Sequence, residues 1–199
     1  IEDNQVTGSL CIKFPWPGIA RTIWGDHQRY KDTYFSTFPG KYFTGDGALR
    51  DEVGYYRITG RVDDVINVAG HRLSTAEMEE IVASHHSVAE CAVIGINDEL
   101  KGQIPLALVV AKSGEDIEHF QLQYEVVHLV REQIGAVASL RDVVVVNRLP
   151  KTRSGKILRK MMRSIADGEK FQVPSTIDDE AIIDEIREVL EHAKIGCFK

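Results

Sequence analysis

The sequence changes character at residues 60–72, G-R-V-D-D-V-I-N-V-A-G-H-R, and this change limits how the chain can fold. Residues 55–59 alternate as a strand does, and Val65–Val68 is a second short run typical of a strand. Asp63 and Asp64 stand between the two runs, and adjacent carboxylates resist burial because they would lose their hydration. Two interpretations are open here: a hairpin turn that its aspartates solvate, or a solvated joint in the chain.

The pattern on the two sides of this joint differs. Before residue 72 no helical periodicity of useful length appears, apart from a short helix starting near residue 26. After it helices and strands alternate, and Ser74-Thr75-Ala76-Glu77 has the form of a capping box. We expect strands over residues 5–14, 41–46, 55–59, 88–96, 104–111 and 143–146, and helices over residues 74–84, 116–134, 157–165 and 178–192.

This order predicts an α+β protein. A β-rich part, residues 1–62, precedes a compact α+β domain, residues 63–199, with a three-stranded sheet, packed helices and a terminal helix extension. The extension is residues 178–192, whose apolar residues form one stripe. The stripe could pack on the domain, which we expect, or bind a partner.

Composition narrows the classes of function. The net charge is −6, and residues 63–150 carry six Lys and Arg against fourteen Asp and Glu, which argues against a broad nucleic-acid-binding face. Cys11, Cys91 and Cys197 form no C-x-x-C pair, so neither a disulfide framework nor a zinc site is indicated, and a reducing, cytoplasmic compartment fits best. No apolar run is long enough for a membrane span. The chain starts at Ile1 without Met, and we expect it to be a piece of a longer protein.

Three stretches carry side chains that could do chemistry. Asp46 ends Y-F-T-G-D, where its carboxylate could accept two sugar hydroxyls or could close an Asx turn on its own backbone. Arg61 and Arg72 flank the joint and could clamp phosphate, or could be solvated surface arginines. Lys156 ends the loop P-K-T-R-S-G-K, which is not a P-loop, and could place positive charge on a reacting carboxylate or phosphate. The basic residues 151–163 could equally be a solvated helix face or a nucleic-acid patch.

Together, Y-F-T-G-D, G-R-V-D-D-V-I-N-V-A-G-H-R and P-K-T-R-S-G-K closely resemble motifs of the adenylate-forming acyl-CoA synthetases, and within them the acetyl-CoA/propionyl-CoA synthetase branch. The resemblance covers nearly the whole chain, but enzymes of this family are much longer. Residues 1–62 resemble the end of their large N-terminal domain, and residues 63–199 resemble their small C-terminal domain. The resemblance implies an acid–thiol ligase that uses ATP, Mg²⁺ and coenzyme A on a short-chain carboxylic acid, acetate or propionate.

The resemblance also implies roles for residues near the joint. Asp46 would bind the ribose hydroxyls of adenosine, and Arg61 would lie near the ribose and phosphate. Asp63 would be the hinge about which the C-terminal domain rotates. The rotation answers two conflicting demands: adenylation needs a cation on the carboxylate, whereas thioester formation needs the same space open for a thiol.

Four residues of the C-terminal domain receive roles in the same way. Arg72 would contact the phosphates of ATP, Gly70 would line the coenzyme A tunnel, and Arg131 would reach the nucleotide end of coenzyme A. Lys156 would bridge the acyl carboxylate and the α-phosphate during adenylation, and would leave the site before the thioester forms. In this branch that lysine is also a target of acylation, so lysine-acylating and deacylating enzymes are expected partners.

The sequence departs from the family pattern at two places. Ala69 stands where many acetate enzymes have Ser, which makes propionate or another short acid credible, and residues 132–140 differ from the commoner E-I-G-P-L-A. The chain contains no Ser/Thr/Gly-rich phosphate loop and no acyl pocket, so we expect it to form no acyl-adenylate by itself. The alternative is a non-catalytic module that holds coenzyme A or a partner, with Lys156 as an acylation target.

Overall fold

The computed structural model describes residues 3–114 and 117–199. The chain divides into two compact units, Ile1–Asp64 and Val65–Lys199, and the division follows the Asp63–Asp64 pair directly. The architecture is α+β, as the sequence predicts. Within the described residues no helix has the length and apolar character needed to cross a membrane.

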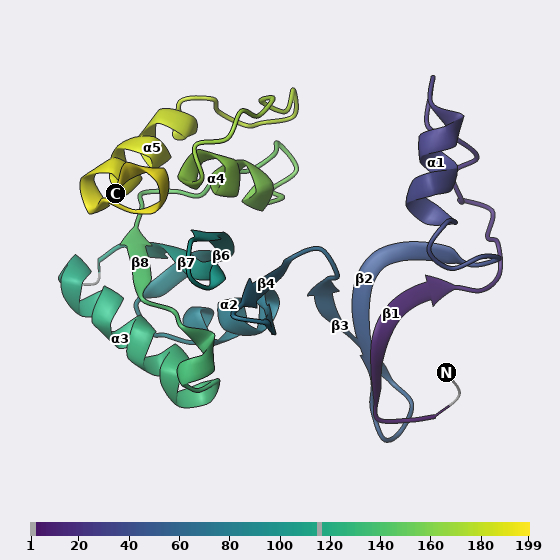
Figure 1. Ribbon diagram of the computed structural model, residues 1–199, viewed down its shortest axis with the longest axis horizontal. Coiled ribbons are helices and arrows are strands. Elements are labelled where there is room, and N and C mark those ends of the chain that lie inside the picture. The colour runs from purple at the N-terminus through teal and green to yellow at the C-terminus, as the bar shows by residue number, and fades with distance from the viewer. Residues whose placement is uncertain (1–2, 115–116) are drawn as a thin grey trace. The chain divides into compact units, whose positions relative to one another are not determined.

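Unit 1 is built on a three-stranded antiparallel sheet in the order β1-β2-β3 (Figure 1). Its elements are β1 (Val6–Ile12), α1 (His27–Tyr34), β2 (Tyr42–Arg50) and β3 (Tyr56–Arg61). The helix begins where Asp26 Oδ1 accepts a hydrogen bond of 3.0 Å from the backbone N–H of Arg29. Aromatic rings join the helix to the sheet, since the rings of Tyr34 and Tyr42 stack with centroids 4.9 Å apart.

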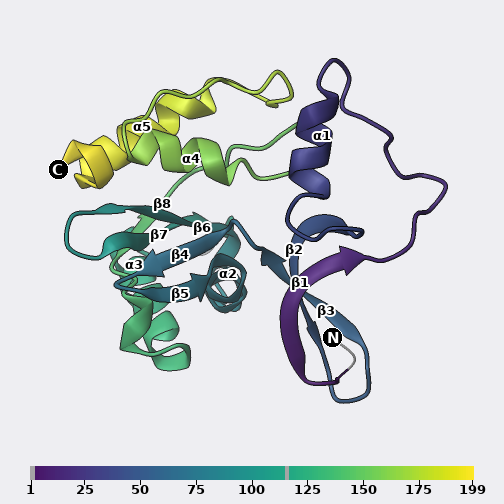
Figure 2. The ribbon, with the colours of Figure 1, turned by 45° about the vertical axis from the view of Figure 1, so that its right-hand side comes forward.

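Unit 2 holds a mixed sheet in the order β5-β4-β7-β6, with β8 parallel to β7 (Figure 2). Its elements are β4 (Val65–Val68), β5 (His71–Ser74), α2 (Thr75–Ala83), β6 (Val88–Asp98), β7 (Gly102–Ala111), α3 (His119–Gln133), the 3₁₀ turn η1 (Ala136–Ala138), β8 (Asp142–Val145), α4 (Arg159–Ala166), α5 (Ile182–Ala193) and the 3₁₀ turn η2 (Gly196–Phe198). The expected start of α3, Asp116, lies outside the described residues.

The three strands expected for this sheet are present as β6, β7 and β8, but β4 and β5 extend it to five strands among the described residues. β4 is the strand-like run Val65–Val68 of the sequence, whereas β5 has only four residues and was not expected as a strand. Their pairing also decides between the interpretations of Asp63–Asp64. Since β3 pairs with β2 whereas β4 pairs with β5 and β7, the two aspartates do not close a hairpin.

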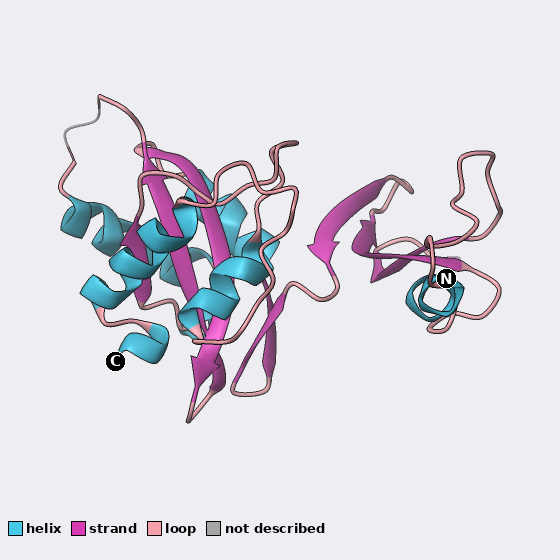
Figure 3. Ribbon diagram, turned by 90° about the horizontal axis from the view of Figure 1, so that it is seen from above, coloured by secondary structure: helices cyan, strands magenta, loops and turns pink. Residues whose placement is uncertain are grey.

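Helices cover both faces of the unit 2 sheet (Figures 1 and 3). Val93, Ala107 and Val109 belong to a buried cluster with residues of α2 and α3. Their neighbours in sequence point the other way, and Ile94 and Leu108 are buried with residues of α4 and α5. Because both faces are buried, β6 and β7 have nearly continuous apolar sequences.

The terminal extension packs on the domain through Ile182, Ile186 and Leu190, which are buried in the cluster that includes α4. The expected packing of its apolar stripe is therefore confirmed. The helix starts at residue 182 rather than 178, because Asp179 Oδ1 accepts a hydrogen bond of 3.0 Å from the N–H of Ala181 and forms a turn first.

Candidate functional site

In unit 1, three of the predicted residues meet through one guanidinium group. Asp46 and Arg61 are paired across β2 and β3. Arg61 Nη1 donates to the Thr44 carbonyl oxygen at 3.1 Å and lies 3.4 Å from Asp46 Oδ1. Arg61 Nε donates to Asp63 Oδ1 at 3.1 Å, so the arginine connects the strand corner with the residue predicted to be a hinge.

Gly45 makes room for this guanidinium. Its φ is +80°, and a Cβ added to it would lie 2.6 Å from Arg61 Nη2. The corner is also fixed by Thr44, whose Oγ1 accepts the N–H of Asp46 at 3.1 Å. The Asx turn considered for Asp46 does not form, because the carboxylate faces Arg61 instead of its own backbone.

The charge of Arg61 is stabilised by its surroundings. Burial by itself would lower the pKa of this guanidinium, but its hydrogen bond with Asp63 and the charges of Asp63, Asp46 and Asp64 raise the pKa overall. About a third of the Asp46 side chain is accessible, at 32%, so its carboxylate can still accept hydrogen bonds from a ligand.

In unit 2, Gly70 lies in a two-residue turn between β4 and β5. Val68 pairs with His71, and the residues between them, Ala69 and Gly70, have φ of 48° and 89°. Positive φ at both positions is what a type I′ turn requires. A Cβ added to Gly70 would meet nothing within 4 Å, so the turn needs glycine there for its φ and not for lack of space.

Lys101, which the sequence did not single out, connects this turn to the neighbourhood of Arg131. Its carbonyl oxygen accepts the N–H of Ala69 at 2.8 Å, and its Nζ donates to Ser139 Oγ at 3.1 Å. Ser139 and Arg131 line a hollow of about 230 Å³ together with Arg141. Lys101 thus bonds to the residue before Gly70 and to a residue that lines the same hollow as Arg131, and Arg72 is exposed on β5.

Lys156 lies on a second part of unit 2, at the end of the lysine loop, residues 150–156. Thr152 organises this loop: its N–H donates to the Lys156 carbonyl oxygen at 2.8 Å, and its Oγ1 accepts the Lys156 N–H at 3.1 Å. Gly155 supplies the turn with a φ of +84°. The Lys156 side chain is exposed, and it makes no hydrogen bond or ion pair with any described residue.

No direct hydrogen bond or ion pair within unit 2 joins Lys156 to Gly70, Arg72 or Arg131 among residues 65–114 and 117–199. Some of the basic side chains in the loop and in α4 are paired with acids. Lys151 Nζ lies 2.6 Å from Glu90 Oε2, and three of the six basic residues from 151 to 163 have such carboxylate partners. This pairing leaves less free positive charge than a nucleic-acid patch needs.

Glu79, on α2, is a second residue whose contacts the sequence did not reveal, and it lines a hollow with Lys151 and Gly155 of the loop. Its carboxylate accepts hydrogen bonds from Nε and Nη2 of Arg159, at 2.8 and 2.7 Å, and from the N–H of Val93 at 2.8 Å. Cys91 Sγ donates to the Glu79 carbonyl oxygen at 3.4 Å. Burial, and then the charge of Glu79, raise the pKa of the Cys91 thiol to about 11, so this thiol is held in its unreactive form.

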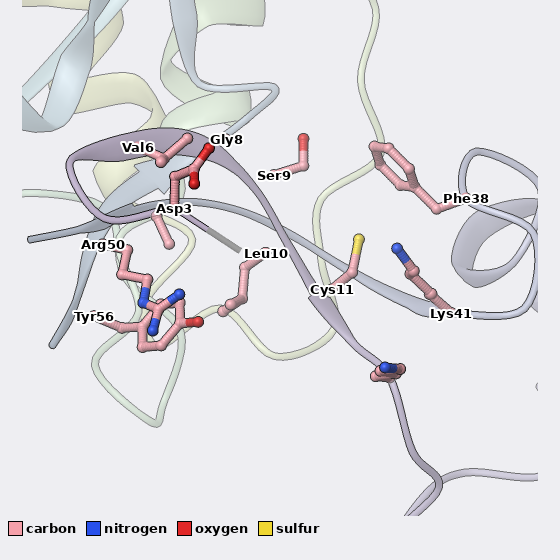
Figure 4. Close-up of a pocket in the computed structure, with 12 residues that line it drawn as sticks. Asp3, Val6, Gly8, Ser9, Leu10, Cys11, Phe38, Lys41, Arg50 and Tyr56 are labelled. Atoms are coloured by element: carbon pink, nitrogen blue, oxygen red, sulfur yellow. The ribbon is translucent and has the colours of Figure 1, made fainter. Parts of the chain in front are cut away.

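Unit 1 also has a hollow of about 400 Å³ on β1 and β2, lined among others by Cys11, Lys41, Arg50 and Tyr56 (Figure 4). No predicted site residue lines it. Burial raises the pKa of Cys11, opposed by the charge of Lys41.

The described residues offer little to a metal ion. Across residues 3–114 and 117–199, no three His, Cys, Asp or Glu side chains converge as a metal site would require. Mg²⁺ keeps most of its ligands from water and substrate phosphates in nucleotide-using enzymes. Three converging protein ligands are therefore more than such a Mg²⁺ ion requires.

Comparison with known proteins gives consistent results. Residues 77–156 match the family described as AMP-binding enzyme C-terminal domain. An uncharacterized protein of Pseudomonas aeruginosa is 60% identical over 95% of this chain and 30% of its own length, and the acetyl-coenzyme A synthetase of Aeromonas hydrophila is 52% identical over 96% and 30%. An acetoacetyl-CoA synthetase from Streptomyces lividans has the same fold, with a TM-score of 0.78 and 24% identity over 96% of this chain and 29% of that one. The chain thus spans under a third of the length of these relatives.

Proposed function

Because this chain belongs to the adenylate-forming acyl-CoA synthetases, whose C-terminal part it spans, we propose that the whole protein converts a short-chain acid, ATP and coenzyme A into acyl-CoA, AMP and pyrophosphate. In the first step a carboxylate oxygen attacks the α-phosphorus of ATP, and pyrophosphate leaves. In the second step the thiol of coenzyme A attacks the acyl carbon, and AMP leaves. The chain contributes charge and positioning to both steps.

The observation that carries this proposal is the state of Lys156. An exposed ammonium group with no hydrogen-bond or ion-pair partner among the described residues, at the end of an ordered loop, is ready to stabilise negative charge on a substrate. During adenylation Lys156 bridges the acyl carboxylate and the α-phosphate, where charge increases as the bond forms. Its exposure also makes it accessible to lysine-acylating and deacylating enzymes, and acylation would remove the charge that the first step needs.

In unit 1, Asp46 binds the ribose hydroxyls and Arg61 stands beside the ribose and phosphate. The 3.4 Å approach of Arg61 to Asp46 and its bond to Asp63 support this role, since one guanidinium fixes both carboxylates. Asp63 serves as the hinge. Its exposed position, with 68% of its side chain accessible, suits a residue whose backbone turns while its carboxylate stays hydrated.

In unit 2, Arg72 contacts the phosphates of ATP, and after rotation Gly70 lines the coenzyme A tunnel. Arg131 reaches the nucleotide end of coenzyme A. The bonds of Lys101 support a common role for Gly70 and Arg131, because they connect the turn at Ala69 with Ser139, which lines the same hollow as Arg131. Lys156 makes no hydrogen bond or ion pair with Gly70 or Arg131, and this supports its use in a different half-reaction from theirs.

The acid is acetate or propionate, because the similar enzymes include an acetyl-coenzyme A synthetase and Ala69 replaces the Ser common in acetate enzymes. We place the protein in the cytoplasm, with its cysteines free, as Cys11, Cys91 and Cys197 are here. Residues 1–199 alone should form no acyl-adenylate.

The full-length protein tests this function directly. It should release AMP and pyrophosphate, and form acyl-CoA, when given ATP, coenzyme A and either acid. The ratio of kcat/KM for the two acids identifies the physiological one. Release of ADP in place of AMP, or no acyl-CoA with either acid, would refute the proposal.

A further inference from the structure

The segment that leads into the terminal helix extension lies against the lysine loop. We call residues 174–179 the bracing segment. Thr152 of the loop and Ile177 of the segment form an antiparallel bridge. Ile177 is 4% exposed and belongs to the core cluster, so this contact is fixed to the body of unit 2.

Two backbone hydrogen bonds, made by the neighbours of Thr152 and Ile177, form this bridge. The N–H of Arg153 donates to the Thr176 carbonyl oxygen at 2.9 Å, and the N–H of Asp178 donates to the Lys151 carbonyl oxygen at 3.0 Å. The outer edge of the loop is thus paired over three consecutive residues, as in a short strand.

Thr152 connects this paired edge of the loop to Lys156. Its neighbours Lys151 and Arg153 make the hydrogen bonds to the bracing segment, whereas its own N–H and Oγ1 bind the backbone of Lys156. The backbone of Lys156 is consequently connected to the bracing segment through Thr152 and its two neighbours in the chain. Its side chain is left exposed.

The bracing segment is itself anchored by Arg148, which follows β8. Arg148 Nη1 lies 2.8 Å from Asp179 Oδ2, and its Nε donates to Glu185 Oε2 at 3.2 Å. The guanidinium thereby ties the end of the segment and the first turn of α5 to the sheet. The segment is held from both sides, by a buried isoleucine and by this ion-pair triad.

The part of the chain that matches the AMP-binding C-terminal domain ends at residue 156, so the bracing segment lies outside it. We propose that this segment is a positioning element for Lys156, by which the C-terminal extension sets the accuracy of the adenylation step. The proposal rests on the function proposed above for Lys156. It assigns no contact with substrate to residues 174–179.

This role has a specific consequence for the two half-reactions. A reacting group misplaced by about 1 Å can lose on the order of 100-fold in rate. Loosening the segment should therefore slow pyrophosphate release from acid and ATP. Thioester formation from supplied acyl-adenylate and coenzyme A should be spared, because Lys156 acts only in the first step.

The test compares two substitutions at one exposed position in the full-length protein. Asp178→Pro removes the N–H that donates to Lys151, whereas Asp178→Ala keeps it. Asp178→Pro should slow adenylation about 10- to 100-fold and leave thioester formation within about twofold. Asp178→Ala should leave both steps unchanged. Arg148→Ala, which loosens the segment without altering the loop backbone, should show the same selective loss in weaker form.

Trypsin supplies a readout that does not depend on activity. Cleavage after Arg153 should be several times faster in Asp178→Pro than in Asp178→Ala. The two variants should have the same midpoint of thermal unfolding. Equal loss of both half-reactions, or unchanged adenylation and cleavage in Asp178→Pro, would overturn the inference. Lys156→Ala is assayed in parallel: if it retains adenylation, the proposed function fails, and if it alone loses adenylation, only the bracing role fails.

Discussion

Replacing Gly45 by alanine tests how the corner of β2 holds Arg61. The backbone there has a φ of +80°, and a left-handed residue with a Cβ costs about 1–2 kcal/mol. The new methyl group would also lie 2.6 Å from Arg61 Nη2, so the guanidinium must move and lose its bond to the Thr44 carbonyl oxygen. One lost hydrogen bond adds about 0.5–1.5 kcal/mol. The total is about 1.5–3.5 kcal/mol.

Gly40→Ala is a matched control. Gly40 has a φ of +76°, but nothing lies within 4 Å of an added Cβ, so this substitution brings the strain without the collision. The full-length proteins are compared by scanning calorimetry. Gly45→Ala should lower the melting temperature of its domain further than Gly40→Ala does, by less for each additional kcal/mol than the about 2–4 °C of a 150–250-residue domain, because the N-terminal domain is larger.

A double variant isolates the collision. In an Arg61→Ala background the guanidinium is gone, so adding Gly45→Ala should cost only what Gly40→Ala costs. If Gly45→Ala is no worse than Gly40→Ala in the parent protein, or if its cost is the same with and without Arg61, then Arg61 does not occupy the space over Gly45.

Three other predictions follow from particular contacts. Gly70→Ala should weaken the β4–β5 hairpin by about 1–2 kcal/mol, because the φ of Gly70 is +89°. Amide hydrogen exchange in residues 65–74 should become faster, and unchanged exchange would contradict this prediction. At pH 8 the exposed Cys197 should react with iodoacetamide well before Cys91, because burial raises the pKa of the Cys91 thiol to about 11. Peptide mass mapping measures the order of labelling, and faster labelling of Cys91 would contradict this prediction. Arg148→Ala should destabilise unit 2 above about pH 4, because Arg148 contributes to lowering the pKa values of its two carboxylate partners in the folded state. The difference from the parent should shrink as the pH falls further, and a constant difference in acid melts would be evidence against the ion pairs.

The sequence predicts best the elements that have long, unbroken apolar patterns. β6 and β7 have ten or more residues each with buried side chains on both faces, so their apolar runs are plain in the sequence. β4 is visible in the sequence as the short run Val65–Val68, but β5 escapes such reasoning because it has four residues and depends on a two-residue turn. The start of α5 was placed four residues early, because the Asp179 turn that precedes the helix has no apolar period.

The residues of the candidate site also fall into two groups, those that the sequence reveals and those that only the fold reveals. Asp46, Arg61 and Lys156 stand out in the sequence because they lie in short motifs with turn residues. Lys101 and Glu79 do not, because their partners lie 38 and 80 residues away, and only the folded sheet brings them together. The bracing segment is another such case, since its pairing with the lysine loop is through the backbone and leaves no side-chain signature.

The central claim, that Lys156 serves adenylation and not thioester formation, is tested most directly by separating the two half-reactions in the full-length protein. Lys156→Ala is compared with Lys160→Ala, which removes another exposed lysine four residues later on α4. Pyrophosphate release should fall by orders of magnitude in Lys156→Ala alone, while thioester formation from supplied acyl-adenylate continues at the parent rate. Loss of both half-reactions, or normal pyrophosphate release without the lysine, would contradict the account.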